Sequence, residues 1–393
     1  MMWGFFKHEW REFFTNRKNM AVYLLLIFLS LFYWIQIENN FEIIERVSRQ
    51  ELQASVDTKT EFLDTVNQEG EVHPDTQAAI DSFPAIVENE EQQLQLLDKK
   101  EYKKFSEVRS QWYQGLKYKP SPLYYKDGSS FADLEYFYQS ASMIVKLTEY
   151  SQLKEPINLK TINEKTATHS LIRAMDYLIP VILLVCGLIF SMDLLARDRK
   201  HPSMIKGMPI TDGKKLIVKG SVAFLGTVAT CLPLSVGFIG MGLKNGFGSL
   251  NLPVATSKFP GKIPLLGDII FDNMSVGQFF LRFFILVTLL VLIVIAINLC
   301  LGIWIKNAYF LLIITLGLPF IELFYNRPGY GDIHAINYLP TSYVHVGEII
   351  SGHRSFFWSG TQITFEFSLI ILGITLFVLV MLLFITSRFK RIV

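Results

Sequence analysis

The sequence predicts an all-α integral membrane protein with six transmembrane helices, an N-terminal amphipathic helix, a mainly helical extracytoplasmic domain and an outer re-entrant segment. Of the 393 residues, 51% are hydrophobic and only 18% are charged, whereas soluble proteins carry about a quarter charged residues. The hydrophobic residues gather in long blocks rather than spreading through the chain. Lys and Arg (37) nearly balance Asp and Glu (35), so no basic excess indicates a nucleic-acid partner.

Residues 1–19 are predicted to form a cytoplasmic amphipathic helix that lies in the membrane interface. Trp3, Phe6, Trp10 and Phe13 recur at spacings of three and four, which places their rings on one helix face. Basic residues lie off this face, as in helices whose apolar side enters the headgroup region. The alternative is a simple cytoplasmic extension of the first span.

Six apolar stretches are long enough to cross about 30 Å of hydrocarbon at about 1.5 Å per residue. They are residues 20–37, 177–195, 220–243, 283–305, 308–325 and 367–386. Only Lys306 and Asn307 separate the fourth from the fifth, which predicts a tight helical hairpin. The first stretch is too long for a signal peptide and lacks a small-residue cleavage site, so we expect an uncleaved anchor.

The distribution of Lys and Arg predicts the orientation of the spans, because cytoplasmic segments retain positive charge. If the N-terminus is inside, the inside segments hold 15 Lys and Arg in 52 residues, against 22 in 219 residues outside. Both termini are therefore assigned to the cytoplasm, and the chain to the plasma membrane of a bacterium. The predicted divisions are 1–19, 20–37 (first span), 38–176 (extracytoplasmic domain), 177–195 (second span), 196–219 (cytoplasmic loop), 220–325 (third to fifth spans), 326–366 (outer loop) and 367–393 (sixth span and basic C-terminus).

Residues 38–176, here called the insert, have the composition of a separate, mainly α-helical domain. Between positions 38 and 170 the insert carries 23 acidic and 15 basic residues, a local net charge of −8. The stretches 41–66 and 77–113 have apolar residues at helical spacing and are expected to face one another as a helical hairpin. All three cysteines lie in the apolar blocks, so no disulfide is expected in the insert.

The two other outer loops are predicted to differ in structure. In residues 244–282, repeated Gly and Pro are expected to break any regular element. Residues 333–352 are too apolar for a free loop and too interrupted for a seventh span. Non-helical backbone at membrane depth needs protein or water around it, so a re-entrant element is predicted within 326–366.

Residues 196–219 are predicted to form a short helix across the cytoplasmic membrane face. The segment is dense in charge, and Pro202 and Pro209 bracket a short apolar turn. A partner that grips such a helix can tilt both attached spans. An ordinary positively charged inside loop would account for the charge but not for the apolar turn.

This segment resembles the coupling loop of the type-2 ABC exporter permeases, in the branch with a large extracytoplasmic insert after the first helix. In that family an acidic-basic pair is followed by a short helix, then Pro, Ile or Val, Ser or Thr, and a Lys at the start of the next span. The residues at these positions here are Asp198, Arg199, Pro209, Ile210, Thr211 and Lys219. The resemblance extends over the membrane part of the chain and not over the insert.

The resemblance implies that the chain couples a separate ABC ATPase dimer to export. ATP and Mg would be bound by that partner, with no cofactor in this chain, and a second permease copy would complete a homodimer in the lipid bilayer. The residues implied in ATPase coupling are Arg197, Asp198, Arg199, Lys200, Met204, Ile205, Met208, Pro209, Ile210, Thr211 and Lys219. The nearest approach to a P-loop, residues 207–215, has the wrong spacing and precedes a span instead of following a strand.

No catalytic residues and no metal site are predicted, and the chain is not expected to be an enzyme. His345, Glu348 and His353 lie close in sequence but lack the HExxH spacing that puts two imidazoles on one helix face. No Ser-His-Asp or Cys-His grouping can be assembled on one side of the membrane.

Three polar residues in or near the spans are candidates for a transport path, because a charge buried in a membrane is usually functional. They are Asp193, Asn298 and Glu322. For the two acidic residues, a solvated position at a helix end is the equal alternative.

Together these observations favour the membrane subunit of an ATP-driven exporter. Peptide, antimicrobial or lipid-like substrates fit an aromatic-rich path, and a sodium ion also remains open. The alternative is a membrane-anchored sensor or interaction protein whose helical outer domain binds a ligand. Six spans and a re-entrant segment are more than an anchor needs, and no constellation supports an intramembrane enzyme.

Overall fold

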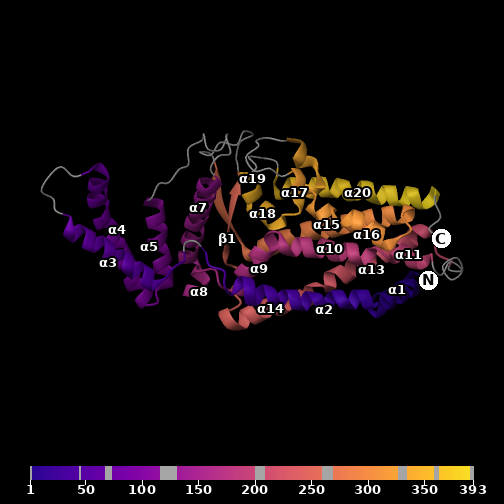
Figure 1. Ribbon diagram of the computed structural model, residues 1–393, viewed down its shortest axis with the longest axis horizontal. Coiled ribbons are helices and arrows are strands. Elements are labelled where there is room, and N and C mark those ends of the chain that lie inside the picture. Colours follow the sequence, from indigo (N-terminus) through magenta and orange to yellow (C-terminus); the bar gives the residue numbers. More distant parts are fainter. Residues whose placement is uncertain are drawn as a thin grey trace.

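The computed structural model describes residues 2–43, 46–66, 73–115, 131–199, 209–258, 269–325, 334–357 and 363–389. It is elongated and mostly helical, with a bundle of apolar helices at one end and the helices of the insert at the other (Figure 1). The described part of the chain begins and ends at the free end of the bundle, here called the terminal end (Figure 1). Within the described ranges, five helical runs are long and apolar enough to cross a membrane: Arg17–Glu38, Leu178–Arg199, Asp212–Asn245, Val276–Trp304 and Phe365–Arg388.

The bundle consists of apolar helices, several of which pack on α15. Their bounds are α1 (Met2–Thr15), α2 (Arg17–Phe32) with the π-helical turn η1 (Tyr33–Glu38), α10 (Leu178–Ser191), α11 (Leu194–Asp198), α13 (Asp212–Ala229), α14 (Cys231–Asn245), α15 (Val276–Trp304), α16 (Ala308–Leu316), η3 (Leu318–Phe320), α17 (Glu322–Tyr325) and α20 (Phe365–Phe389). Helix α15 contacts α10, α13, α16 and α20. It begins at a capping box, in which Ser275 Oγ accepts from the Gln278 amide at 3.2 Å and Gln278 Oε1 accepts from the Ser275 amide at 3.4 Å.

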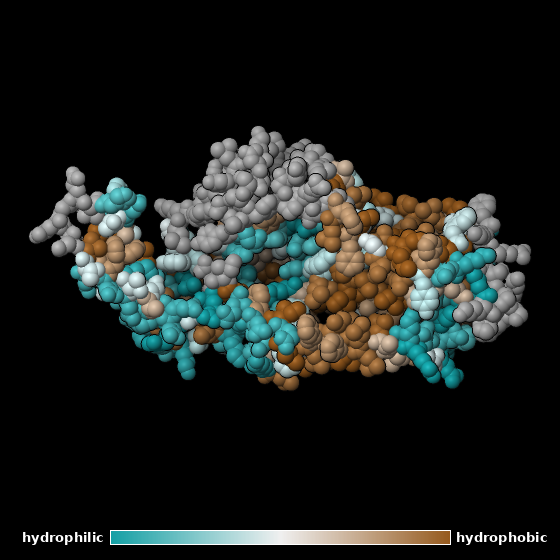
Figure 2. All heavy atoms as spheres, in the orientation of Figure 1, coloured by the Kyte–Doolittle hydropathy of each residue, from teal (hydrophilic) through white to brown (hydrophobic). Residues whose placement is uncertain are grey.

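The outside of the bundle is apolar, as expected of a membrane protein. Figure 2 shows hydrophobic surface over the bundle, and polar surface on the insert and at the terminal end. On α2 the side chains of Leu24 and Phe28 are 66% and 63% exposed. A contiguous apolar surface of this extent is rare on soluble monomers.

The stretch 308–325, predicted as the fifth span, is divided into short pieces. Helix α16 is followed by the 3₁₀ turn η3 and then by α17. Gly317 and Pro319 lie at the break, and a proline inside a helix removes a backbone hydrogen bond. The apolar run here, Ala308–Phe320, is therefore shorter than the five long ones.

The insert consists of helices that pack in sequence order. Their bounds are α3 (Arg49–Thr65), α4 (Pro74–Asp98), α5 (Tyr102–Gly115), α7 (Phe131–Gln152), α8 (Leu159–Ile162) and α9 (Ala167–Asp176). Helix α3 packs on α4, and α5 packs on both α4 and α7. The stretch 77–113 is divided into α4 and α5 by a turn in which Lys100 has φ +59°. Phe105, Leu147 and Tyr150 are fully buried in the insert core.

The expectation of no regular element in 244–282 is wrong. Strands β1 (Pro253–Lys258) and β2 (Ile270–Ser275) form an antiparallel pair in which Val254 lies opposite Met274. Both strands contact α7 of the insert. Pro253 stands at the first position of β1, where a strand tolerates proline, and Gly261 and its Gly and Pro neighbours fall between the strands.

The described part of the last outer loop is a chain of short helices packed against α9, α15 and β1. They are η4 (His334–Tyr338), η5 (Pro340–Tyr343), α18 (Val346–Ser351) and α19 (His353–Phe357). Tyr343, Val346 and Phe356 are fully buried. Between α18 and α19, Gly352 has φ +78° and leaves no room for a Cβ beside the Ser257 carbonyl, so only glycine fits there.

Helices α2 and α14 approach closely at two small residues. Ser30 Oγ donates to the Leu234 carbonyl at 2.5 Å and accepts from the Gly237 amide at 2.9 Å. A Cβ at Gly237 would overlap the Ser30 carbonyl. Small residues at such contacts let helix backbones approach in a membrane.

We expect Gly237→Ala to destabilise the bundle by about 1–3 kcal/mol, because the added methyl group forces α2 and α14 apart. Thermal unfolding of the purified protein in detergent measures the effect. Gly373→Ala in α20 is the matched control, since nothing lies within 4 Å of a Cβ there. Equal melting temperatures of the two variants would contradict the close contact.

Candidate functional site: an ion network at the terminal end

A buried ammonium group joins three helices at the terminal end. Lys219 on α13 is 1% exposed. Its Nζ lies 2.6 Å from Glu9 Oε1 on α1 and 2.9 Å from Asp198 Oδ1 on α11. The ammonium also lies 5.6 Å from the ring centroid of Phe5. Two of the residues predicted to belong to the coupling loop, Asp198 and Lys219, are thus in direct contact.

The basic residues around this pair extend the network. Arg197 Nη1 lies 3.3 Å from Glu12 Oε2, so α11 is also tied to the exposed side of α1. Arg199 donates to the carbonyl oxygens of Gly302 at 2.6 Å and Ile303 at 3.1 Å. A guanidinium at a helix C-terminus satisfies orphan carbonyls and complements the helix dipole. Arg199 therefore caps α15.

The remaining residues of the predicted coupling loop are only partly described. Pro209 and Thr211 are exposed and Ile210 is half-buried at the start of α13, where the Thr211 carbonyl accepts from the Lys215 amide at 3.0 Å. The predicted apolar turn, Met204, Ile205 and Met208, lies outside the described residues, as does Lys200.

The first helix meets the bundle through a face that shares Phe13 with the predicted aromatic stripe. Phe5, Glu9 and Phe13 are buried against the bundle, whereas Trp3 is 65% exposed. Helix α1 ends at Thr15, and the next helix begins with its own cap, in which Asn16 Oδ1 accepts from the Lys18 amide at 3.0 Å. A glutamate midway between two buried phenylalanines at spacings of four is the sequence signal that identifies Glu9.

The three polar candidates in the spans each have partners among the described residues. Asp193 lies 3.1 Å from Lys18 Nζ. Asn298 on α15 donates to the Leu188 carbonyl at 2.9 Å and to Ser191 Oγ at 2.8 Å, which fastens α15 to α10.

Glu322 on α17 is 2% exposed. It forms an ion pair with Arg354 on α19, and its Oε2 lies 3.8 Å from His345 Nε2. Arg354 and His345 in turn contact Glu348 at 3.1 and 3.2 Å. This cluster joins α17 to α18 and α19, and Glu322 is not a solvated helix end. No three His, Cys, Asp or Glu side chains in the described part of the chain are placed to hold a metal ion.

A second ion network, which the sequence analysis did not identify, fastens the insert to the bundle. Arg173 on α9 lies 2.6 Å from Glu38 Oε2 at the end of η1 and 3.7 Å from Glu164 Oε2. Lys146 on α7 lies 2.5 Å from the other oxygen of Glu164. Glu164 has φ +52°, which is unfavourable for a residue with a Cβ. Glu38 and Arg173 stand 135 positions apart, so no local pattern links them.

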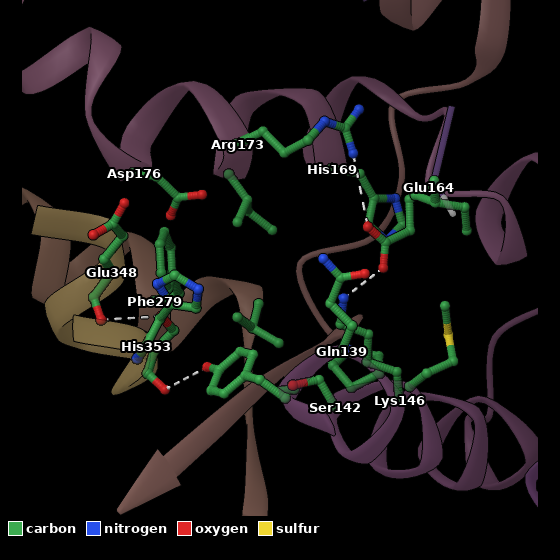
Figure 3. Close-up of a pocket in the computed structure, with 18 of the residues that line it drawn as sticks. Gln139, Ser142, Lys146, Glu164, His169, Arg173, Asp176, Phe279, Glu348 and His353 are labelled. Atoms are coloured by element: carbon green, nitrogen blue, oxygen red, sulfur yellow. Dashed lines mark hydrogen bonds and ion pairs between the residues drawn. The ribbon is translucent and has the colours of Figure 1, made fainter. Parts of the chain in front are cut away.

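The charges around Glu164 control its ionisation and that of its neighbour His169. Burial by itself would raise the pKa of Glu164, but Lys146 and the other nearby cations lower the pKa to about 2. Burial lowers the pKa of His169 to about 4. The neutral imidazole contacts Tyr150 Oη at 3.0 Å and Thr166 Oγ1 at 2.7 Å, so both of its nitrogens have a partner. A cavity of about 460 Å³ is lined at one end by Glu164, His169 and Lys146 (Figure 3).

Comparison with protein-family models, curated proteins and solved structures found no match to this chain.

We expect Lys219→Met to destabilise the protein by about 3–5 kcal/mol, because Glu9 and Asp198 would be left buried without a cation. Thermal unfolding in detergent measures this loss. Lys214→Met, which changes an exposed lysine on the same helix, is the control. The triple variant Lys219→Met/Glu9→Gln/Asp198→Asn should recover most of the stability, because no unpaired charge remains. A triple variant as unstable as Lys219→Met would show that the charges are not responsible.

We also expect acid to destabilise the protein through His169. Its pKa is lower in the folded than in the unfolded chain, so the unfolded state binds the proton first and stability falls as the pH drops from about 6.5 to about 4, by about 3 kcal/mol. His169→Gln should flatten the melting temperature over this range. His73→Gln, which changes a histidine whose side chain is 72% exposed, should keep the pH dependence of the unchanged protein. Parallel curves for both variants would contradict the assignment to His169.

Proposed function

We propose that this chain is the transmembrane permease subunit of an ATP-driven exporter related to the type-2 ABC transporters. The observation that carries the proposal is the contact between Asp198 and Lys219, 2.9 Å apart on either side of residues 200–208. Because both flanks of this loop share one buried ion pair, a force applied to the loop acts on α11 and α13 together. Through Glu9, the same force acts on α1.

The proposed topology has six crossings, with both termini in the cytoplasm of a bacterial cell. An odd number of crossings would put the termini on opposite sides of the membrane, whereas the described part of the chain begins and ends at the same end of the bundle (Figure 1). The broken run α16–η3–α17 is proposed as the additional crossing, and η4 to α19 as the re-entrant segment on the other side.

In the proposed mechanism a separate ATPase dimer docks on residues 200–208 of each permease copy. ATP and Mg are bound by the ATPases, and their closure on ATP biases a two-state equilibrium of the spans. A second copy of this chain completes the path, along which a peptide, antimicrobial or lipid-like compound, or a sodium ion, leaves the cell. The ion network makes α1, α11 and α13 move together as a unit during this change.

The alternative is a membrane-anchored sensor whose insert binds a ligand. The cavity of about 460 Å³ beside α7 and α9 favours this reading. The two functions are separable, because only the exporter requires an ATPase partner.

The proposal predicts that the purified chain binds the ATPase encoded beside it and stimulates its ATP hydrolysis several-fold. Replacing residues 202–209 by a Gly-Ser linker of equal length should abolish both effects and leave the melting temperature unchanged. The same replacement at residues 261–268, between the two strands, is the control and should retain binding. Pull-down and phosphate release measure the two effects. If the unaltered chain neither binds the ATPase nor changes its hydrolysis, the sensor reading replaces the exporter.

A further inference from the structure

A cavity lies at the junction of insert and bundle. It lies between α7 and α9 of the insert and the elements β1, α18 and α19 (Figure 3). A volume of about 460 Å³ lies within the range of about 300–1,000 Å³ that ligand pockets occupy. Its apolar wall includes the rings of Tyr138 and Phe279 and the side chains of Met143, Ile172 and Val254.

The charges of the residues that line the cavity favour a cationic ligand. Five carboxylates line the cavity, against two permanently cationic side chains, Lys146 and Arg173. Both cations are engaged at one end: Lys146 lies 2.5 Å from Glu164, and Arg173 lies 2.6 Å from Glu38. Neither is available to an anion that enters the cavity.

At the other end of the cavity, the carboxylate of Asp176 has no cationic partner in contact with it. Glu348 contacts Arg354 at 3.1 Å, and Glu135 contacts His353 at 3.8 Å. The side-chain carboxylate of Asp176 makes no hydrogen bond or ion pair within the ranges that the structure describes, and the charged groups near it act on it only at longer range. Burial raises the pKa of Asp176 to about 7, and the neighbouring Glu348 adds to the rise. An ionised carboxylate in this position lowers the stability of the folded protein unless a cation lies beside it.

A second polar group in the wall is also unused. Ser142 on α7 is 6% exposed, and its Oγ has no hydrogen-bond partner among the described residues. Figure 3 shows Ser142 and Asp176 on opposite walls of the cavity. A buried hydroxyl without a partner is rare in folded proteins, and one that lines a cavity is available to a ligand.

We propose that this cavity binds a small organic cation, with its ammonium group against Asp176 and its apolar body against Tyr138, Phe279 and Ile172. Aromatic faces attract cations as well as apolar groups. A bare metal ion does not fit, because no three suitable ligands are placed together within the described ranges. The inference does not rest on the proposed export function, since binding is measured on this chain alone.

Binding should depend on pH in a defined direction. A cation binds the ionised form of Asp176, so affinity rises as the pH passes upward through the pKa of the free carboxyl group. Glu348 and His353 face Asp176 from α18 and α19, Arg173 from α9, and Lys146 from α7. Burial by itself would lower the pKa of His353, but Glu135 and Glu348 outweigh it and raise the pKa. A protonated His353 repels the ligand, which acts in the same direction.

The test is calorimetric titration of the full chain in detergent with phenethylamine and with its neutral analogue 2-phenylethanol. We expect the amine to bind and the alcohol to bind at least about tenfold more weakly. Asp176→Asn should weaken amine binding by at least about tenfold, whereas Asp57→Asn, at an exposed position on α3, should leave it unchanged. Equal binding of amine and alcohol, or unchanged binding by Asp176→Asn, would overturn the proposal.

Two further readouts separate a ligand site from a merely structural role. Between pH 8 and pH 6 the affinity of the unaltered chain should fall by at least about tenfold, as the ionised fraction of Asp176 falls. The affinity of Asp176→Asn should fall much less, because only the protonation of His353 then opposes binding. The melting temperature of Asp176→Asn at pH 8 should equal or exceed that of the unaltered chain, because an uncompensated charge is removed. A lowered melting temperature would identify Asp176 as a structural residue and overturn the proposal.

The source of the ammonium group is resolved by a second probe, phenylalanyl-glycine amide, and its N-acetylated form. Tighter binding of the free peptide than of phenethylamine would identify a peptide N-terminus as the cation. Tighter binding of phenethylamine would identify a free amine. Binding of the acetylated peptide as tightly as the free one would contradict a cation site.

Discussion

The arrangement of the terminal end depends on one buried ammonium group. Lys219 lies between Glu9 and Asp198, with all three side chains almost completely buried. Removing two charges from water costs several kcal/mol per ion, and only close pairing offsets this cost. Separating the three residues would be unfavourable, so the ion network keeps α1, α11 and α13 in contact. Arg197 and Arg199 extend the same constraint to the outer face of α1 and to the end of α15.

The junction with the insert is held by an ion network of the same kind, a cation between two carboxylates. Here the central group is the guanidinium of Arg173, which contacts Glu38 and Glu164. Its ring partner Phe41 lies 4.1 Å from the guanidinium carbon. Because the carboxylates come from the end of the first span and from the insert, these charges fix the insert against the bundle. The cavity exists because α7 and α9 are held in this position.

The two ends are connected by one run of helix, Leu178–Arg199. Asp176 stands just before its start, and Arg197 and Asp198 stand near its end, about 30 Å away at 1.5 Å per residue. Asn298 fastens the middle of this run to α15. A ligand at Asp176 and a protein that binds residues 200–208 would therefore act on opposite ends of the same helical run.

The sequence by itself determined five long apolar runs and the change of composition at Glu38, because apolar runs and charge density are local properties. The family resemblance named Asp198 and Lys219 separately, without predicting that they are in contact. Tertiary structure decided that Glu9 joins them, that Arg173 meets Glu38, and that Asp176 is left without a partner. These outcomes depend on how the chain folds, because folding brings together residues more than 100 positions apart in the sequence. Periodicity reports the face on which a side chain lies, but only packing decides what the side chain meets there.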